Sequence, residues 1–531
     1  MVTQWSRAPR VPLGGVVRSP RSATAVFPLK RADALVRVAV MALAPMFVCA
    51  QTTTTVVTVD SNLAATDNGA LSPSGLERHD LIASIRPKVA IARRGAGLEF
   101  NLDAAVNLLG YANGTQRGGV LPEVSASLKG ALVERLLFVD AAAQVRSTEV
   151  DAFGARADDT TGANRRTQGS YRVSPYIERE FAPHTSLLAR HDATLTTNGA
   201  GVGARLLSNH TLLRIERKPV PLGAALELSR LDNEASGFTN SRFTQDTARL
   251  RGSIGLANEV VLGAVAGTER SRFLLSDHTD ALYGLSVQWK PGPRTELSAS
   301  LEHRFFGIGG ELALRHRMPF LSFALTMSRQ PIMASESLGV LGQGADIRTF
   351  LDGILTTRYP DPVARAELVD NLVTSRGIDT RSTSPIDVVA EYPQLQTAAN
   401  ATLVLLGTRN TASLTLYAQT VRQITRDGDP LASSITATAD SRQLGAAFQF
   451  NRRLTPQLSA EVVARWSKIT GLAARTGDIS DAKTYRLSLT QNLSPRTGVS
   501  AGVQQNRFTS TVSGKNSYDT TLVFVGMSHR F

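Results

Sequence analysis

The sequence has very little cysteine and few aromatic residues. Of its 531 residues one is cysteine, Cys49, and 6% are aromatic. A single thiol excludes a disulfide framework within the chain and a multi-cysteine metal site. Although 42% of the residues are hydrophobic, no run of about eighteen apolar residues occurs beyond the N-terminal region. This excludes a bundle of membrane-spanning helices, but it does not exclude a β-barrel, whose strands alternate apolar and polar residues.

Long runs of one charge are absent too. The formal net charge is +13, and it falls to +7 for residues 51–531, since seven basic residues and one acidic residue precede them. The basic residues are scattered among acidic ones, without a Lys/Arg run or an aromatic stacking motif. We therefore expect no nucleic-acid binding. Weak attraction to acidic glycans or to lipid headgroups stays open.

The first fifty residues have the pattern of an export signal. A basic flank precedes an apolar stretch, residues 38–50, of which about twelve residues are apolar, too few to span a bilayer. Small residues at its end predict cleavage after Ala50. Acylation of Cys49 is disfavoured because Val48 is bulky. The long segment before Lys30 suggests a start codon assigned too far upstream.

Period-two alternation runs from about residue 80 to the end and predicts β-strands. In TYRLSLTQNL, for example, Tyr485, Leu487 and Leu489 oppose Arg486 and Ser488. Short turns alternate along the chain with longer polar stretches. The short turns are expected near residues 95, 133, 183, 219–221, 258, 291–293, 319, 408–410, 456 and 495, and the longer stretches near 67, 158, 236, 277, 429, 477 and 513. Such an alternation of short and long connections is typical of outer-membrane barrels, in which the tight turns lie at the periplasmic end and the longer loops at the other end.

Counting the runs predicts an all-β, transmembrane antiparallel barrel of about twenty-two strands, with eighteen or twenty if some runs are loops. Aromatic residues near strand ends indicate two interfacial belts. They are Trp289, Phe448, Phe450 and Phe531 on the turn side and Tyr283, Phe305, Trp466 and Tyr485 on the loop side. The last strand ends at Phe531, which we interpret as the signal for the barrel assembly machinery. The chain thus divides into a signal peptide, 1–50, and a barrel, 51–531, in the outer membrane of a Gram-negative bacterium.

One segment, residues 334–383, breaks the alternation. Ile347, Phe350, Leu351, Ile354 and Leu355 have helical spacing, and Asp361-Pro362 predicts the start of a second helix that ends at Gly377. The alternation of short turns and long loops along the chain predicts that this two-helix insertion belongs to the long-loop side. It either folds inward and narrows the lumen or sits above the mouth, and a plain surface decoration is the alternative.

The stretches GLERHDLIASIRPKVAI, GPRTELSASLEHRFFGIGGELALRHRMPFLSFALTMSR and YPDPVARAELVDNLVTSRG, with the closing strand, resemble outer-membrane β-barrel proteins associated with PEP-CTERM/exosortase systems. The resemblance covers most of the chain after the signal, although this sequence has fewer Tyr and Trp than that family. It implies a context of exopolysaccharide synthesis and export and of surface-protein sorting, and it implies no catalytic motif.

Alternation also predicts which charged side chains line the lumen. The candidates are Glu99, Asp103, Arg249, Arg251, Glu302, Arg304, Arg315, Arg317, Glu461, Arg465, Arg486 and Arg530. Such side chains either select solutes along a transport path or form ion pairs that fill and stiffen the barrel. A slight excess of arginine favours a sugar or an acidic polymer over a cation.

No enzyme motif is present, and we expect neither catalysis nor a cofactor or metal. Two weaker hypotheses concern chemistry: a metal pair of His303 and His316, and a barrel-embedded hydrolase built from Ser298, His303 and Asn506. The favoured function is a passive pore or secretion component for exopolysaccharide, gated by the insertion. The alternative is a docking protein with a closed lumen that binds surface glycan or sorted proteins. Partners would be outer-membrane lipid, the assembly machinery and periplasmic export proteins.

Overall fold

A computed structural model describes the chain from residue 52 onwards, apart from several connecting segments. The described residues are 52–95, 97–149, 151–155, 164–198, 205–236, 241–256, 259–273, 276–332, 347–376, 378, 394–424 and 440–531. The export signal and Gly377 lie outside these residues. No helix among them has the length and apolarity needed to cross a bilayer.

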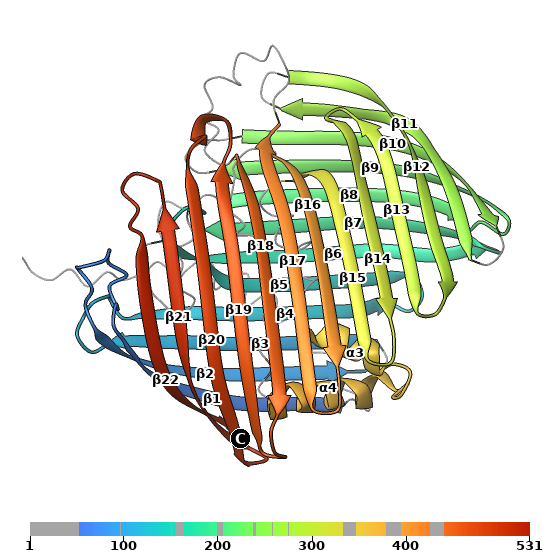
Figure 1. Ribbon diagram of the computed structural model, residues 1–531. Coiled ribbons are helices and arrows are strands. Elements are labelled where there is room, and N and C mark those ends of the chain that lie inside the picture. The colour runs from blue at the N-terminus through green and yellow to red at the C-terminus, as the bar shows by residue number, and fades with distance from the viewer. Residues whose placement is uncertain are drawn as a thin grey trace, which may run out of the picture. The chain divides into compact units, whose positions relative to one another are not determined.

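Within the described residues, twenty-two strands form one antiparallel sheet, which confirms the predicted architecture and strand number (Figure 1). Every strand pairs with its neighbours in the chain. The strands are β1 Thr52–Thr66, β2 Asp80–Arg94, β3 Leu98–Tyr111, β4 Gly119–Val133, β5 Leu137–Glu149, β6 Arg165–Ala182, β7 Thr185–Asn198, β8 Arg205–Arg217, β9 Leu222–Ser236, β10 Ser241–Leu256, β11 Val260–Phe273, β12 Ser276–Gly292, β13 Thr295–Arg304, β14 Gly307–Arg317, β15 Leu321–Ile332, β16 Gln394–Leu406, β17 Asn410–Gln423, β18 Ser441–Arg453, β19 Leu458–Gly471, β20 Ile479–Ser494, β21 Thr497–Ser510 and β22 Tyr518–Arg530.

The sheet closes on itself because β1 also pairs with β22. Their register runs from Thr58 opposite Arg530 to Thr66 opposite Leu522. At the end of this seam the Phe531 amide donates to the Val57 carbonyl over 2.9 Å. A closed wall has no free strand edge, so its backbone groups are satisfied without water.

The wall is apolar outside and polar inside. On β20, Tyr485, Leu487 and Leu489 are 52%, 50% and 47% exposed, whereas Ser488 between them is buried. On β22, Val523, Val525 and Met527 are likewise exposed, and Phe524 is buried. Large apolar side chains on the outer face of a closed barrel need lipid around them, so the fold is a transmembrane β-barrel.

Connection lengths separate the two ends of the barrel. Connections after even-numbered strands have two to four residues, and they include all ten predicted short turns. Connections after odd-numbered strands range from two residues, between β11 and β12, to the sixty-one between β15 and β16. We call these the turn end and the loop end. The prediction of a longer stretch near Asp277 was wrong, because Asp277 lies within β12.

The longest connection contains two helices, α3 Ile347–Leu355 and α4 Pro362–Arg376, which confirms the two-helix insertion. In α3 all five apolar residues at helical spacing are buried, as the sequence pattern predicts. Proline is the first residue of α4, where its missing N–H leaves no intrahelical bond unmade.

Candidate functional site

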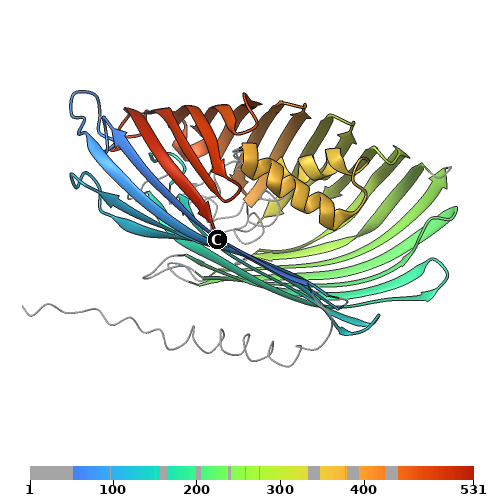
Figure 2. The same cartoon turned by 90° about the horizontal axis from the view of Figure 1, so that it is seen from below.

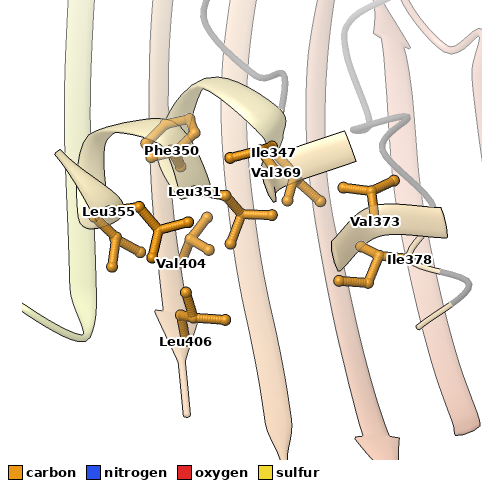
Figure 3. Close-up of a cluster of buried hydrophobic side chains, with 10 residues drawn as sticks. Ile347, Phe350, Leu351, Leu355, Val369, Val373, Ile378, Val404 and Leu406 are labelled. Carbon is orange, nitrogen blue, oxygen red and sulfur yellow. The ribbon is translucent and has the colours of Figure 1, made fainter. Parts of the chain in front are cut away.

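The two helices lie inside the barrel, enclosed by the wall (Figure 2). Their buried side chains pack on Val404 and Leu406 of β16, which are 0% and 8% exposed (Figure 3). Leu405 between them is 42% exposed on the outer face. Because side chains alternate along a strand, Val404 and Leu406 point into the lumen, and the helices contact them there.

The helices sit at the turn end, although their connection begins and ends at the loop end. β15 ends at Ile332 and β16 begins at Gln394, both at the loop end. Val404 and Leu406 close β16, about 35 Å further along the strand at roughly 3.3 Å per residue. The two helices therefore lie in the lumen at its turn end, where they contact β15, β16 and β18.

Arg376 ties the C-terminal end of α4 to the wall. It is 7% exposed. Its guanidinium donates to Thr411 Oγ1 over 2.8 Å and to the Thr408 carbonyl over 3.1 Å. The Arg376 carbonyl accepts from Asn451 Nδ2 over 2.6 Å. Burial lowers the pKa of Arg376, and repulsion from Arg453 lowers it further.

Two more arginines fix α3. Arg317 of the wall donates to the Gly353 carbonyl over 3.4 Å and to the Pro293 carbonyl over 2.9 Å. Arg365 of α4 donates to the Asp352 carboxylate over 2.7 Å and so joins the helices. The insertion is therefore held by directed polar contacts besides its apolar cluster.

On another part of the wall, charged side chains form a ladder across the lumen face. Glu227 of β9 accepts from Arg214 of β8 over 2.9 Å and from Arg249 of β10 over 3.0 Å. Arg249 also reaches Glu302 of β13 over 3.2 Å. The intervening strands carry Gly267 opposite Arg249 and Gly284 opposite Glu302, so no side chain occupies these two positions.

A second branch of the ladder is centred on Glu269 of β11, whose side chain is 0% exposed. Its carboxylate accepts from Arg304 over 2.8 and 3.0 Å and from the Gln245 amide. The Arg304 guanidinium also lies over the Phe306 ring, 5.2 Å from its centroid. The charges of this sector neutralise one another.

All twelve predicted lining residues lie on the lumen-facing positions of their strands. The structure brings Arg249 and Glu302 together and places Arg304 next to them, while Arg317 contacts α3. Asp103 pairs with Lys88 over 3.5 Å, Glu461 accepts from Gln449 over 2.7 Å, and Arg486 lies over the Phe524 ring. The remaining five are spread over five strands of the wall: Glu99, Arg251, Arg315, Arg465 and Arg530.

A lumen-side contact at the loop end was missed from the sequence. The segment after β5 packs Phe153, 2% exposed, against Ile469 of β19 and Val512. Since Val462 on β19 is exposed to the outside, Ile469 is on the lumen face, and Phe153 reaches into the mouth. The Arg475 guanidinium covers the Phe153 ring at 4.0 Å from its centroid. A phenylalanine in an otherwise polar loop is the only sequence signal for this contact.

Asp151 anchors the same segment. Its carboxylate accepts from the Phe153 amide over 3.0 Å and from Lys515 over 3.0 Å. Burial raises the pKa of Asp151, but the Phe153 amide, Lys515 and Arg475 outweigh it and hold the pKa below its ordinary value. The carboxylate is therefore charged at neutral pH.

The two chemical hypotheses and one aromatic assignment were wrong. His303 is opposite Ile308, whereas His316 is opposite Thr295 at the other end of the hairpin, so they form no metal pair. Ser298 and His303 lie on opposite faces of β13, and Asn506 is on β21, which separates the three hydrolase candidates. Phe305 packs with the lumen-side cluster of Leu206 and Phe243 and not in an outer belt.

No protein-family model matches the sequence, and no curated protein matches it. Solved structures that resemble the fold include the apoprotein form of the FrpB iron transporter from Neisseria meningitidis, with a TM-score of 0.49. The two sequences are 9% identical, and the match covers 90% of this chain and 81% of that chain. The siderophore receptor PirA from Pseudomonas aeruginosa is similar too, with a TM-score of 0.43, 9% identity and coverage of 90% and 80%.

Proposed function

We propose that this chain is an outer-membrane pore whose lumen is closed at rest by α3 and α4, and that their displacement opens it to a polar solute. The observation that carries the proposal is the position of the helices: they are lodged in the lumen, on a connection that starts from the opposite end. A surface decoration would have no reason to enter the barrel.

The strength of the docking contact supports a movable gate. Most of the apolar cluster lies within the helices, and the wall contributes chiefly Val404 and Leu406. Burial of two such side chains is worth roughly 3–6 kcal/mol. The helix pair thus keeps a core of its own, and its displacement has to break this contact and the hydrogen bonds of Arg317, Arg376 and Asn451.

The chemistry of the lumen favours a hydrated, hydroxyl-rich solute. The inner faces of β16 to β18 carry uncharged amide and hydroxyl side chains, which include Gln396, Thr402, Thr415, Gln419 and Gln443. The charged sector is neutralised by its own ion pairs. Such a surface gives no strong preference for either sign of ion. A polysaccharide fits it, and the resemblance to PEP-CTERM-associated barrels supports exopolysaccharide export as the setting.

Planar-bilayer conductance tests the gate. We expect few or small channel events from the full protein and a large, steady conductance after residues 345–377 are deleted. Unchanged mobility of the unboiled protein on gels is the control for an intact barrel. If the deletion variant is folded and still does not conduct, the closed docking protein is the better description.

The setting is tested in the cell. Loss of the gene should reduce surface polysaccharide while leaving its synthesis inside the cell intact. Polymer that reaches the surface in normal amounts would contradict the export role without bearing on the barrel or its gate.

A further inference from the structure

The outer wall carries a row of basic side chains near the loop end of five consecutive strands. They are Arg422 of β17, Arg442 of β18, Lys468 of β19, Lys483 of β20 and Arg507 of β21. Each is at an outward-facing position of its strand. At about 4.8 Å between strands, the row extends over roughly 19 Å. We call it the basic row.

Aromatic neighbours fix the depth of the basic row in the membrane. Trp466 precedes Lys468 by two residues on the outer face of β19, and Tyr485, 52% exposed, follows Lys483 by two on β20. Below them the outer face is apolar, with Val462 and Leu487 exposed. Tryptophan and tyrosine concentrate at the headgroup level, so the basic row lies at the level of lipid phosphates.

The basic row is only partly neutralised by the protein. Outward-facing acids on the same strands and on β22 are Asp481 and Asp519. Asp481 accepts from Trp466 Nε1 over 2.8 Å and lies 3.6 Å from Lys483 Nζ. Within the described residues, Arg442, Lys468 and Arg507 have no ion-pair partner within 4 Å. Three cations at headgroup depth are therefore open to external anions.

The opposite sector of the barrel provides a contrast. At the loop end of β9 to β12, outward-facing arginines form ion pairs with aspartates: Arg242 with Asp232, Arg270 with Asp277, and Arg272 with Asp246. Arg230 also lies 3.7 Å from Asp246. Glu234 of β9, whose charge acts on Arg242, supplies the fourth carboxylate for the four arginines. This neutral lattice satisfies its cations internally, which the basic row does not do.

We propose that the basic row binds the phosphate groups of a phosphorylated glycolipid in the leaflet at the loop end. Guanidinium groups match phosphate oxygens in a bidentate geometry, and lysine adds a point charge. A row of roughly 19 Å is long enough to contact more than one phosphate group of the same headgroup. The inference rests on the orientation expected for an outer-membrane barrel, with the short turns in the periplasm and the loop end at the cell surface.

Native mass spectrometry of the detergent-purified barrel tests this. The probe is a glucosamine-disaccharide lipid with two phosphates, compared with its dephosphorylated form and with inorganic phosphate. The variant combines Arg442→Gln, Lys468→Gln and Arg507→Gln; the matched control combines Arg230→Gln, Arg242→Gln and Arg270→Gln in the neutral lattice. We expect at least about a tenfold loss of lipid binding in the first variant and less than about a twofold change in the control.

Equal binding by both triple variants, or equal binding of the dephosphorylated lipid, would overturn the proposal. Displacement of the bound lipid by inorganic phosphate alone would show a general anion site without specificity for the lipid. This result would overturn the proposal too. The heat-dependent gel shift confirms that each variant is folded. Because the measurement requires no conductance, its result is independent of whether the helices gate the pore.

Discussion

Arg376 brings a positive charge into the interface between α4 and the wall without a carboxylate partner among the described residues. Its hydrogen bonds to the Thr408 carbonyl and to Thr411 Oγ1 therefore offset part of the free-energy cost of burying the charge. Arg453 adds repulsion. Arg376 thus holds α4 to the wall by hydrogen bonds, while its buried charge and the repulsion from Arg453 destabilise the same contact.

Arg376→Ala should favour the open pore. It leaves two wall acceptors without their donor, at a cost of about 1–3 kcal/mol, which corresponds to a roughly fivefold to hundredfold shift toward displaced helices. Single-channel open probability measures the shift. Arg453→Gln is the control of opposite sign, since it removes the repulsion and should lower the open probability. Equal effects of the two variants would contradict the attachment.

Asp151 makes the lumen-side contact of Phe153 at the loop end sensitive to acid. Its pKa in the folded chain is below that of an unfolded aspartate, about 3.9. The stabilisation is therefore fully present above that pH and is lost as pH falls through the lower, folded value. We expect the segment 151–155 to stay packed at pH 5 to 7 and to loosen only in stronger acid.

Asp151→Asn should loosen the same segment at neutral pH, because Lys515 and Arg475 lose their anion. Hydrogen exchange at Phe153 and Gly154 measures this, with Asp277→Asn on the distant outer wall as the matched control. The result that would count against the assignment is slow exchange at Phe153 in the variant at pH 7.

At the scale of elements, α3 depends on Leu351, which is 0% exposed at the centre of the cluster with Val404 and Leu406. Leu351→Ala should cost about 2–5 kcal/mol and release α3 from the wall. Conductance and hydrogen exchange across 347–355 should rise together. Thr349→Ala, on the exposed side of α3, is the matched control and should change neither.

The elements themselves could be predicted from the sequence, because local patterns determine them. Alternation such as Tyr485, Leu487 and Leu489 defines a strand and its outer face, and Pro362 marks the start of α4. Where the insertion lies could not be predicted, since it depends on contacts between α3 and residues some fifty positions away, Val404 and Leu406. The same holds for Phe153, whose partner Ile469 is distant in sequence and on another side of the wall.

For the candidate site, the face of each charged residue followed from alternation, but its partner did not. Arg249 and Glu302 are on strands that are not neighbours, and their ion pair depends on Gly267 and Gly284 at the positions between them. Alternation along a strand predicts which face a side chain is on. It does not predict which residues lie side by side across four strands. The ion pairs of the ladder therefore could not be predicted from the sequence.

For the whole molecule, the closed wall predicts behaviour of the purified protein. Residues 51–531 should need detergent to stay in solution, since the outer face exposes large apolar side chains all round. Unboiled protein should migrate faster on gels than boiled protein, because the hydrogen-bonded wall resists the detergent. Identical migration, or solubility without detergent, would falsify the barrel.

The seam between β1 and β22 has a consequence for biogenesis. Its hydrogen bond from Ser61 to Met527 joins positions 466 residues apart, so the ring is completed only after nearly the whole chain has been delivered. Until then two strand edges stay unsatisfied, and each is a template for aggregation. A stop codon anywhere upstream of β22 would thus yield an open, sticky sheet and not a smaller channel, and cells should degrade it.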